Sequence, residues 1–424
     1  MHTLKEIYQD NEERNFIDPS LYSRYRVKAG LRNDNGTGVK VGLTKICDVI
    51  GYKIIHEKKY NIDGQLIYRG YPINYLVNKQ PSDKICGFEE TAYLLIFGTL
   101  PNADQLKTFK DYLLNFKMGP VDLQYETPNI LNALQIEVLK LYAKDPSADT
   151  DDLEERMMKG LKILASIPLF TFSYARNKVF KSYPYPDRSL AENILCMARG
   201  NDQYTFEEAK IMDTLLMVHT DHGGGNNSTF ANVVISSTGT DIYSCISAAI
   251  GSLKGPKHGG ANCKVTNMFK AIFHEVGFTT DQATLKKIAN RILDKDFFDH
   301  SGLIYGIGHA IYTKSDPRAL LIHEQCEALA KSKGQEEIYN CIHAFEKVAV
   351  EVMKERKGID VCANVDYYSG YVYSLLGIEA DLFTPLFAIS RTAGWVSHHL
   401  ENRQSNRKLI RPANVYVGEM EEIK

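Results

Sequence analysis

Apolar residues recur at three- and four-residue spacing through much of the chain, which places them on one face of a helix. In residues 88–101 (FEETAYLLIFGTLP) this pattern predicts a helix that ends at Gly98 and Pro101, two residue types that stop helices. Residues 189–200 (SLAENILCMARG) begin with a serine that can cap a helix and end with a glycine that can close one. Both segments are therefore predicted to be helical.

Two longer segments, residues 281–298 and 336–358, are amphipathic, and the second closes on Lys-Glu-Arg-Lys-Gly as helix ends often do. Alternating patterns typical of strands are few. Residues 60–73 (YNIDGQLIYRGYPI) resemble a β-hairpin, with Ile-Asp-Gly-Gln at 62–65 expected to supply the turn. The predicted fold class is mainly α-helical, with one or two small β-hairpins.

Composition narrows the class of protein. The chain has 424 residues, of which 44% are hydrophobic and 24% are charged, as in ordinary soluble globular proteins. This length allows two or three domains around a large buried core. The formal net charge of -2 gives no reason to expect binding to nucleic acid or to an anionic membrane surface.

The first residues of the chain and the length of its apolar runs indicate where in the cell we expect the protein. The first 13 residues include four acidic side chains and no apolar core, so we expect neither a secretory signal nor an arginine-rich transit peptide. No apolar run approaches the roughly 18 residues that a membrane helix needs. We therefore expect a soluble, cytoplasmic protein.

The eight cysteines contain no Cys-x-x-Cys pair. Their spread resembles neither a zinc framework nor a small disulfide-stapled scaffold. We expect reduced and mostly buried thiols, as in cytosolic enzymes.

Glycine and proline cluster at four places in the chain, three of which carry a histidine while the fourth follows shortly after an acidic residue. A glycine next to a histidine lets a ligand approach the imidazole closely and exposes backbone N–H donors. Each histidine alone can be a structural turn residue, but three such sites in one chain favour ligand contact. The clusters are residues 223–225, 255–260, 302–308 and around 377–385, and the associated side chains are His222, His258, His309 and Asp366.

His219 and His222 form a His-x-x-His pair with Asp221 between them, which suggests a metal site because imidazole is a good zinc ligand. The pair is a weak signal by itself, since positions i and i+3 of a helix share a face for many other reasons. A His/Asp metallohydrolase, which would need stoichiometric zinc, is an alternative function on this evidence.

Asp366 stands in an apolar, aromatic stretch (VCANVDYYSGYVYSLLGI, residues 361–378), where a carboxylate is costly unless it is paired or used. One hypothesis makes it the N-cap of the following helix. The other makes it a general base whose pKa is set by partial desolvation.

Three arginines complete the set of candidates: Arg318 in DPRA, Arg391 in FAISRTAGW and Arg411 in LIRPANVY. Two of them interrupt apolar runs, although each can also be an ordinary surface arginine. Guanidinium is the usual bidentate partner of a carboxylate. Several histidines, one carboxylate and several arginines together indicate a site for a small polycarboxylate that undergoes proton chemistry.

Several stretches together resemble the citrate synthase family in order and spacing. They are IDGQLIYRGYPI, FEETAYLLIFGTLP, HTDHGGGN, GPKHGGAN, GIGHAIYTKSDPRA and NVDYYSG, followed by SRTAG and RP near the end of the chain. The likeness runs from about residue 60 to 412, and it rests on the joint occurrence of these motifs.

The resemblance implies a mostly helical fold with two domains and an active site in the cleft between them. Residues 1–262 and 376–424 would form the large domain and residues 263–375 the small one. The implied enzyme is an acyltransferase of the tricarboxylic acid cycle, which condenses acetyl-CoA with oxaloacetate and water to citrate and CoA. It implies no metal and no cofactor, and a homodimer as the active form.

By motif position, the resemblance assigns three catalytic residues. Asp366 would remove a methyl proton from acetyl-CoA, and His258 would donate a hydrogen bond to the thioester oxygen. His309 would polarise the oxaloacetate carbonyl and protonate the alkoxide that forms. Oxaloacetate would be held by His222, Arg318, Phe387 and Arg391, and by Arg411 from the neighbouring subunit.

Some positions depart from the commoner family pattern. Lys257 stands where an apolar residue usually precedes the histidine, and Cys263 stands where Glu or Gln is usual. Only Lys314 is carried over as a CoA contact. A close alternative is 2-methylcitrate synthase, which uses propionyl-CoA through the same residues, because one methyl group changes discrimination by only about 1–3 kcal/mol.

Overall fold

In the computed structural model of the chain, the described residues are 9, 16–56, 58–119, 121, 123, 127–405 and 408–418. The chain divides into two compact units, namely Met1–Gly42 with Ile410–Lys424, called the terminal unit, and Leu43–Leu409, called the main unit. The terminal unit contains Arg411, and every other predicted site residue belongs to the main unit. The boundaries of the predicted large and small domains lie inside the main unit, and that division stays a prediction.

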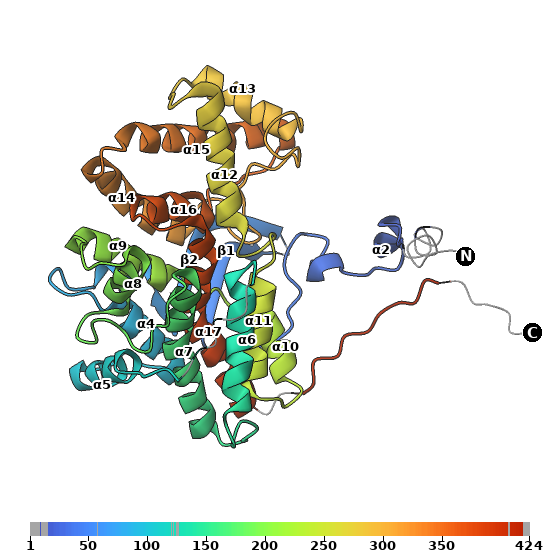
Figure 1. Cartoon of the computed structure of the whole chain (residues 1–424). Coiled ribbons are helices and arrows are strands. Elements are labelled where there is room, and N and C mark those ends of the chain that lie inside the picture. The colour runs from blue at the N-terminus through green and yellow to red at the C-terminus, as the bar shows by residue number, and fades with distance from the viewer. Residues whose placement is uncertain are drawn as a thin grey trace, which may run out of the picture. The chain divides into compact units, whose positions relative to one another are not determined.

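The described residues are mainly α-helical (Figure 1), which confirms the predicted fold class. None of the helices in the described ranges is long and apolar enough to cross a membrane. The terminal unit holds α2 (Ser20–Arg24) and the 3-10 turn η2 (Ala29–Leu31). The helices of the main unit are α3 (Ile73–Asn78), α4 (Gly87–Phe97), α5 (Ala103–Leu114), α6 (Ile130–Ala143), α7 (Leu153–Ala175), α8 (Leu190–Arg199), α9 (Phe206–His219), α10 (Asn227–Ser236), α11 (Ile242–Leu253), α12 (Ala261–Val276), α13 (Gln282–Leu293), α14 (Pro317–Ser332), α15 (Glu336–Lys357), α16 (Val365–Leu375) and α17 (Phe383–Gln404), with the 3-10 turn η3 (Ala380–Leu382).

Helix ends fall where the capping residues predict. Helix α4 closes on Gly98, whose φ of 89° is the left-handed conformation that glycine adopts most easily. In α8, Ser189 and Glu192 form a capping box, and Gly200 closes the last turn with a φ of 71°. Helix α15 closes on Gly358. The predicted helices at 88–101, 189–200 and 336–358 are therefore confirmed.

Helix α13 is shorter than its amphipathic pattern predicts, because it ends at Leu293. Lys295 takes a left-handed φ of 63°, and the Asp296 N–H donates to the Arg291 carbonyl over 2.9 Å. This backbone turn satisfies a carbonyl of the last helical turn. The apolar pattern of residues 281–298 therefore extends past the end of the helix at Leu293, into residues that are not helical.

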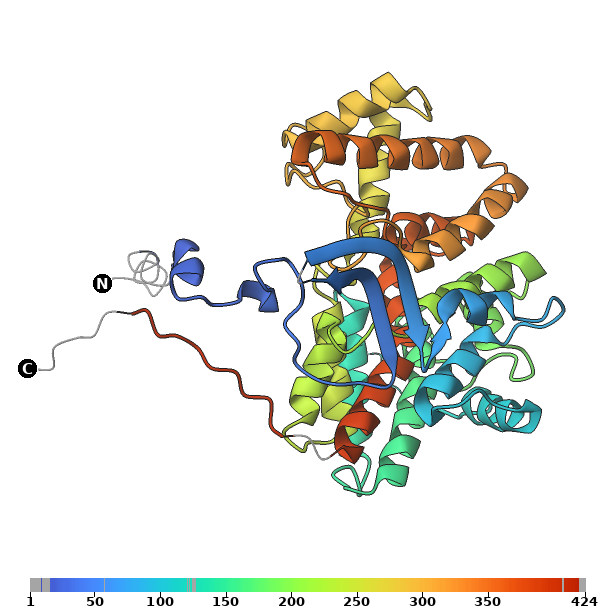
Figure 2. The ribbon, with the colours of Figure 1, turned by 180° about the vertical axis from the view of Figure 1, so that it is seen from behind.

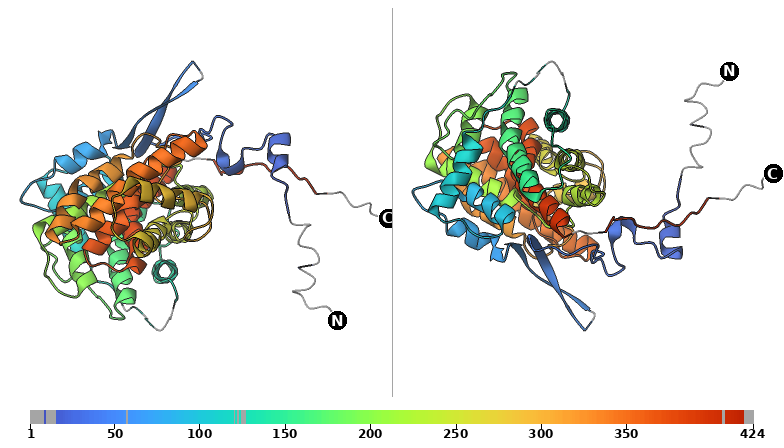
Figure 3. Two further views of the ribbon diagram at one scale, coloured as in Figure 1. Left: turned by 90° about the horizontal axis from the view of Figure 1, so that it is seen from above. Right: turned by 90° about the horizontal axis from the view of Figure 1, so that it is seen from below.

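The sheet is small and antiparallel, with the order β1 (Cys47–Ile55), β2 (Lys58–Tyr68) and β3 (Tyr71–Pro72). One end of the β1–β2 ribbon projects beyond the helices of the main unit in both views of Figure 3. The predicted position of the turn at 62–65 is wrong, because these residues lie within β2. The tight connection to β3 is instead made at Arg69 and Gly70, both of which have positive φ.

Gly64 has a different use from the predicted turn. The pairing of β1 with β2 shifts between Ile50 and Tyr52, opposite the residues that contain Gly64. A Cβ added to Gly64 would lie 2.2 Å from the backbone oxygen of Ser315. The Gly64 N–H also donates to the Ser315 hydroxyl oxygen over 3.1 Å. Glycine therefore permits the hairpin to approach the segment before α14.

Helix α17 lies at the centre of the main unit. It packs against α4, α7, α9, α10, α11 and α12, and nearly all its side chains are buried. The helices α12 to α16 pack on one another, with α13 on α15 and α14 on α16. They gather at one end of the main unit, coloured yellow to orange in Figures 1 and 2.

All eight cysteines are free thiols. Six are buried, and Cys86 and Cys263 are half-buried. The expectation of mostly buried cysteines is confirmed, and their reduced state stays a prediction.

The close approach at Gly64 predicts a stability effect. We expect Gly64→Ala to lower the free energy of unfolding by about 1–3 kcal/mol, because the new methyl group meets backbone rather than a flexible side chain. Gly119→Ala is the control, since a Cβ there has no atom within 4 Å. Urea unfolding measures both variants, and equal stabilities of the two would contradict the close approach.

Candidate active site

His258 lies in the turn Gly255–Gly260, which joins α11 to α12. The His258 N–H donates to the Gly255 carbonyl over 2.9 Å and closes the turn. A Cβ on Gly259 would lie 2.7 Å from the Leu253 oxygen and 2.8 Å from the Thr384 Cγ2. The Thr384 hydroxyl donates to the Gly259 carbonyl over 2.9 Å. Glycine is therefore needed here to dock the turn on α17.

One nitrogen of the His258 ring is held by the protein. Nε2 lies 3.1 Å from the Ser228 hydroxyl, which also accepts the Trp395 indole N–H over 3.2 Å. The same hydroxyl lies 2.9 Å from Asn226 Oδ1. Burial, aided by the charge of Arg391, lowers the pKa of His258 to about 4. The ring is therefore neutral at pH 7, with Nε2 anchored.

Backbone pairing holds the segments of His309 and Asp366 together. The Gly308 N–H donates to the Cys362 carbonyl over 2.8 Å, and an antiparallel bridge joins Ile307 to Ala363. The Asn364 amide donates to the Gly308 carbonyl over 2.9 Å. These bonds link the loop before α14 to the start of α16.

The ring of His309 has a defined proton position. Its Nδ1 accepts the backbone N–H groups of Ile311 and Tyr312, each over 3.1 Å. A neutral ring therefore carries its proton on Nε2. The ring stacks on Tyr312 with a centroid distance of 4.7 Å, and meets the edge of His222 at 5.1 Å.

Asp366 is in the first turn of α16, but it does not cap that helix. Asn364 is the N-cap, and its side chain accepts the Asp366 N–H over 2.9 Å. The N-cap hypothesis for Asp366 is therefore wrong. Its Oδ1 is buried and has no hydrogen-bond partner among the described residues. Burial raises the pKa of this carboxyl to about 7, although Arg318 acts in the opposite direction.

Arg318 is fixed by a carboxylate that the sequence motif does not single out. Its Nε and Nη2 donate to the two oxygens of Asp316, over 3.0 Å and 2.7 Å. Both side chains are buried, and Asp316 is also the N-cap of α14. Burial alone would raise the pKa of Asp316, but the charge and the hydrogen bonds of Arg318 together outweigh it and hold that pKa below its usual value.

Arg391 is a fully buried guanidinium on α17. Its Nε donates to the His219 carbonyl over 2.7 Å, and it lies 4.7 Å from the centroid of the Phe387 ring. Its Nη1 and Nη2 have no partner within the described part of the chain. A buried cation without a partner is costly. These two nitrogens are therefore suited to bind an anion, and a carboxylate fits their geometry.

His219 and His222 face different neighbours. His219 Nδ1 lies 2.7 Å from the Leu215 carbonyl, and its ring packs on Phe387 at 4.7 Å. His222 faces His309, and its buried Nε2 has no partner in the described ranges. Burial, followed by the charge of Arg318, lowers the pKa of His222 well below its usual value.

The described residues contain no group of three or more His, Cys, Asp or Glu side chains that could hold a metal ion. Within that part of the chain, His219 and His222 therefore have no third His, Cys, Asp or Glu side chain with which to form a metal site.

The main unit brings most of the predicted residues together. His222 contacts His309, and Phe387 contacts both Arg391 and His258, at a ring distance of 6.0 Å for the histidine. The charge of Arg318 acts directly on Asp366. Lys314 is exposed in the segment before α14, and Arg411 is exposed in the terminal unit.

Sequence reasoning did not single out the residues that orient this site. Ser228 lies two residues after the motif HTDHGGGN, and Asp316 lies within GIGHAIYTKSDPRA, so both were near the identified motifs. Trp395 follows Arg391 by one helical turn, and Asn364 directly precedes Val365 in NVDYYSG. The roles of Ser228, Asp316 and Trp395 depend on contacts that the sequence does not reveal. Asn364 alone has a recognisable sequence signal, because asparagine is a common N-cap residue.

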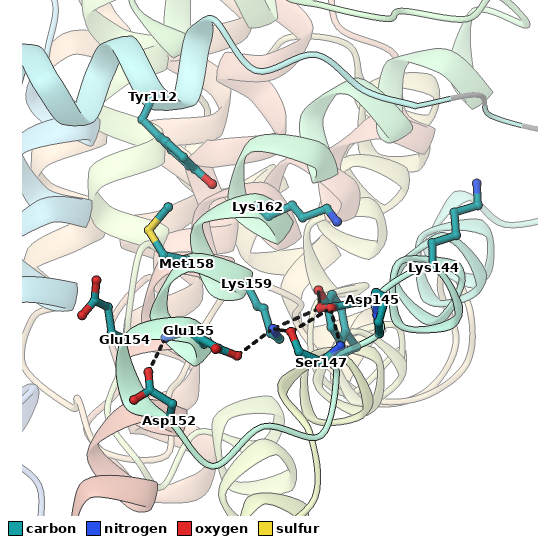
Figure 4. Close-up of a pocket in the computed structure, with 12 residues that line it drawn as sticks. Tyr112, Lys144, Asp145, Ser147, Asp152, Glu154, Glu155, Met158, Lys159 and Lys162 are labelled. Carbon is teal, nitrogen blue, oxygen red and sulfur yellow. Dashed lines mark hydrogen bonds and ion pairs between the residues drawn. The ribbon is translucent and has the colours of Figure 1, made fainter.

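A surface cavity of about 720 Å³ lies elsewhere in the main unit (Figure 4). It is lined by residues of α5, α7, α11 and the connection between α6 and α7. Its buried Lys159 is already paired, with Nζ 2.8 Å from Ser147 Oγ and 3.2 Å from Asp145 Oδ2. None of the predicted site residues lines this cavity, so burial and unpartnered atoms, rather than cavity size, identify the candidate site.

Comparison with known proteins gives matches over most of the chain. Residues 33–413 match the family described as citrate synthase, C-terminal domain. The citrate synthase of Haloferax volcanii is 37% identical over 386 residues, which cover 87% of this chain and 94% of that protein. The 2-methylcitrate synthase 1 of Corynebacterium glutamicum is 33% identical over 366 residues, which cover 83% of this chain and 89% of that protein.

A solved structure agrees with the sequence matches. The citrate synthase of the thermophilic archaeon Thermoplasma acidophilum, in a ternary complex with carboxymethyl coenzyme A and oxaloacetate, has a TM-score of 0.76 to this chain. The two are 26% identical, and the match covers 94% of this chain and 98% of the other. With the family match over residues 33–413, these likenesses show that the chain belongs to the citrate synthase family.

Proposed function

We propose that this chain is an acyltransferase that condenses acetyl-CoA with oxaloacetate and water to give citrate and CoA. The observation that carries the proposal is the buried Arg391, whose two terminal nitrogens have no partner among the described residues, close to neutral histidines. Family membership supports the same reaction. Oxaloacetate supplies the carboxylates that such a site needs.

Asp366 is the proposed base. The methyl protons of a thioester are weakly acidic, so the base must be positioned and its pKa must lie near the working pH. Burial raises the pKa of Asp366 to about 7, which meets this condition. Its unpartnered Oδ1 is free to accept the proton. Removal of that proton leaves an enolate or enol whose charge develops on the thioester oxygen.

His258 is the proposed donor to that oxygen. A neutral imidazole with Nε2 held by Ser228 presents Nδ1 to a ligand. For Nδ1 to carry the proton, the Ser228 hydroxyl must turn its one proton from Asn226 Oδ1, at 2.9 Å, to His258 Nε2, at 3.1 Å. A fixed donor at the developing charge stabilises the transition state more than the ground state.

His309 is the proposed acid for the second substrate. Its Nδ1 accepts two backbone N–H groups, so the proton of the neutral ring is on Nε2. That proton polarises the ketone of oxaloacetate while the enolate carbon attacks it. Transfer of the proton then neutralises the new alkoxide. Water hydrolyses the thioester of the bound citryl-CoA, which releases citrate and CoA.

The remaining contacts hold oxaloacetate. Arg318 and Arg391 bind its carboxylates, with Asp316 fixing the orientation of Arg318. His222, neutral and with a free Nε2, adds a further hydrogen bond. Phe387 packs beside the substrate. Lys314 is the proposed contact with CoA, for which its exposed position before α14 leaves room.

The proposed residues come from both parts of the predicted domain division. His222, His258 and Arg391 belong to the proposed large domain, 1–262 with 376–424, and the mutual packing of α12 to α16 supports a small domain at 263–375. Closure of the two over oxaloacetate would exclude water until condensation is complete.

The active form is proposed to be a homodimer in which Arg411 completes the site of the neighbouring subunit. Arg411 belongs to the terminal unit and is exposed there, which is consistent with a contact outside its own chain. The reaction as written needs no metal and no cofactor. The enzyme is proposed to act in the cytoplasm, in the tricarboxylic acid cycle.

A second candidate is 2-methylcitrate synthase, which the relative from Corynebacterium glutamicum supports. It would use propionyl-CoA with the same residues. The choice depends on the shape of the acyl pocket, where one methylene is worth about 1–3 kcal/mol.

Release of free thiol from each acyl-CoA tests the reaction. We expect oxaloacetate-dependent turnover with a higher kcat/KM for acetyl-CoA than for propionyl-CoA, unchanged by a chelator. Asp366→Asn and His258→Gln should each lower kcat by about 10²–10³, because each removes a group used in the transition state. Lys257→Gln, an exposed neighbour of His258, is the matched control. A higher value for propionyl-CoA would assign the second candidate, and loss of turnover with chelator would favour the metallohydrolase.

The pKa of Asp366 predicts opposite pH dependences of activity and stability. The active base is ionised, so kcat/KM should rise as pH rises through about 7. Between the usual value of 3.8 and about 7, the folded state binds a proton that the unfolded state releases, so stability should fall as pH rises through this window. The loss reaches up to about 4 kcal/mol at higher pH.

Denaturant unfolding at about pH 5 and about pH 8 measures this effect. Asp366→Asn should remove most of the difference in unfolding free energy between these two pH values that Asp366 contributes. The control Asp83→Asn, at an exposed position, should leave that difference unchanged. A wild-type pH slope unaltered in Asp366→Asn would contradict the raised pKa.

Subunit mixing tests the placement of Arg411. Asp366→Asn and Arg411→Leu chains, each nearly inactive, are co-refolded in equal amounts. A hybrid dimer then has one site with an intact Asp366 and an intact Arg411 from its neighbour, so about a quarter of wild-type activity should return. If Arg411 served its own subunit, every site would lack one of the two residues and no activity would return.

A further inference from the structure

A buried carboxylate and imidazole lie behind the proposed substrate contacts, and the mechanism above does not use them. Asp221 Oδ2 is 3.0 Å from His398 Nε2, and the two side chains are 0% and 2% exposed. Asp221 directly precedes His222, and His398 follows Arg391 by two turns of α17. The pair therefore joins the two segments that carry proposed contacts with oxaloacetate.

The main chain at Asp221 is fixed from two sides. The Tyr68 hydroxyl donates to the Asp221 carbonyl over 2.8 Å and accepts the Asp221 N–H over 3.2 Å. On the other side, a Cβ on Gly394 would lie 2.4 Å from the Thr220 oxygen and 2.9 Å from Asp221 Oδ1. With the main chain held by these contacts, the direction of the Asp221 carboxylate is set by its side-chain torsions and by the groups that contact it, among them His398.

Arg391 is the alternative partner for this carboxylate. Burial lowers the pKa of Arg391, and Asp221 is the charge that opposes this most strongly, so the two groups interact through the interior. Opposite charges attract strongly where water is excluded. Even so, Nη1 and Nη2 of Arg391 have no hydrogen-bond partner in the described residues. The carboxylate instead directs Oδ2 at His398.

We propose that His398 is a positioning residue, which holds the Asp221 carboxylate away from Arg391 and keeps the two terminal nitrogens of Arg391 available for a carboxylate of the substrate. The inference rests on the proposed function of Arg391. Without the hydrogen bond from His398, Asp221 can rotate toward Arg391 and compete there with the substrate. The protein's own carboxylate would then occupy the anion site.

Steady-state kinetics of variants at His398 and Asp221 tests this inference. His398→Leu should raise the KM for oxaloacetate about tenfold or more, with kcat and the KM for acetyl-CoA nearly unchanged. His398→Gln retains an N–H donor and should stay near wild type. Asp221→Asn in the His398→Leu background removes the competing charge and should restore most of the oxaloacetate affinity.

His399→Leu is the matched control. His399 is a buried histidine on the same helix, but its Nε2 lies 3.3 Å from Arg156 Nη1. Loss of this imidazole should leave the KM for oxaloacetate unchanged. If buried histidines of α17 serve only to stabilise the fold, His398→Leu and His399→Leu should both lower kcat and stability. Asp221→Asn would then not reverse the effect of His398→Leu.

The outcomes separate this inference from the proposed function. If Arg391→Gln leaves the KM for oxaloacetate unchanged, the proposed function of Arg391 fails. If Arg391→Gln raises it but His398→Leu does not, or if Asp221→Asn does not reverse the effect, the positioning role is overturned and the function of Arg391 stands. Should His398→Leu not fold, Asp221→Asn alone decides: an oxaloacetate KM at or below wild type supports the inference, and a higher one overturns it.

Discussion

A buried guanidinium whose terminal nitrogens have no hydrogen-bond partner is tolerated only where the surrounding structure holds it rigidly, and within the described residues the site depends on this condition at Arg391. Helix α17 supplies the rigidity, since it is enclosed by other helices along most of its length. One face of the helix then organises the neighbouring segments. Phe387 packs on the ring of His258, and Trp395 donates to the hydroxyl that anchors the same ring. His398 holds the carboxylate before His222. A single helix thus orients two motifs that are far apart in sequence.

The pKa values of two buried carboxylates, Asp316 and Asp366, are shifted in opposite directions, and the difference lies in their partners. Asp316 has a bidentate contact with Arg318, so it stays ionised despite its burial. Asp366 Oδ1 has no hydrogen-bond partner in the part of the chain that the structure describes, so burial dominates and the pKa of Asp366 rises to about 7. The same exclusion of water lowers the pKa of His258 to about 4. Burial therefore provides a poised base and a neutral donor, whereas the contact with Arg318 keeps Asp316 charged as an anchor.

Local signals predicted the helix ends well, because a cap needs only the residues beside it. Ser189 with Gly200 shows this at α8. The same logic failed at Gly64, where an Asp-Gly pair typical of a turn serves instead for close contact with Ser315. It also left open whether Asp366 caps α16, which required the position of Asn364. The motifs predicted which groups carry chemistry, but not Ser228 or His398, whose roles arise from contacts between segments distant in the chain.

The proposed site is built from two rigidly held groups of residues. Backbone pairing joins the segments of His309 and Asp366, whereas α17 orients the segments of His222 and His258. Where the groups meet, His222 and His309 touch through the edge and face of their rings. Such a ring contact is worth only about 0.5–1.5 kcal/mol. It can separate and form again without leaving a hydrogen bond broken in the interior. The segment of His309 is also tied to the hairpin by the hydrogen bonds from the Gly64 N–H to Ser315 Oγ and from the Tyr312 hydroxyl to the Gln65 carbonyl, so any opening of the site must break these bonds or move the hairpin with it.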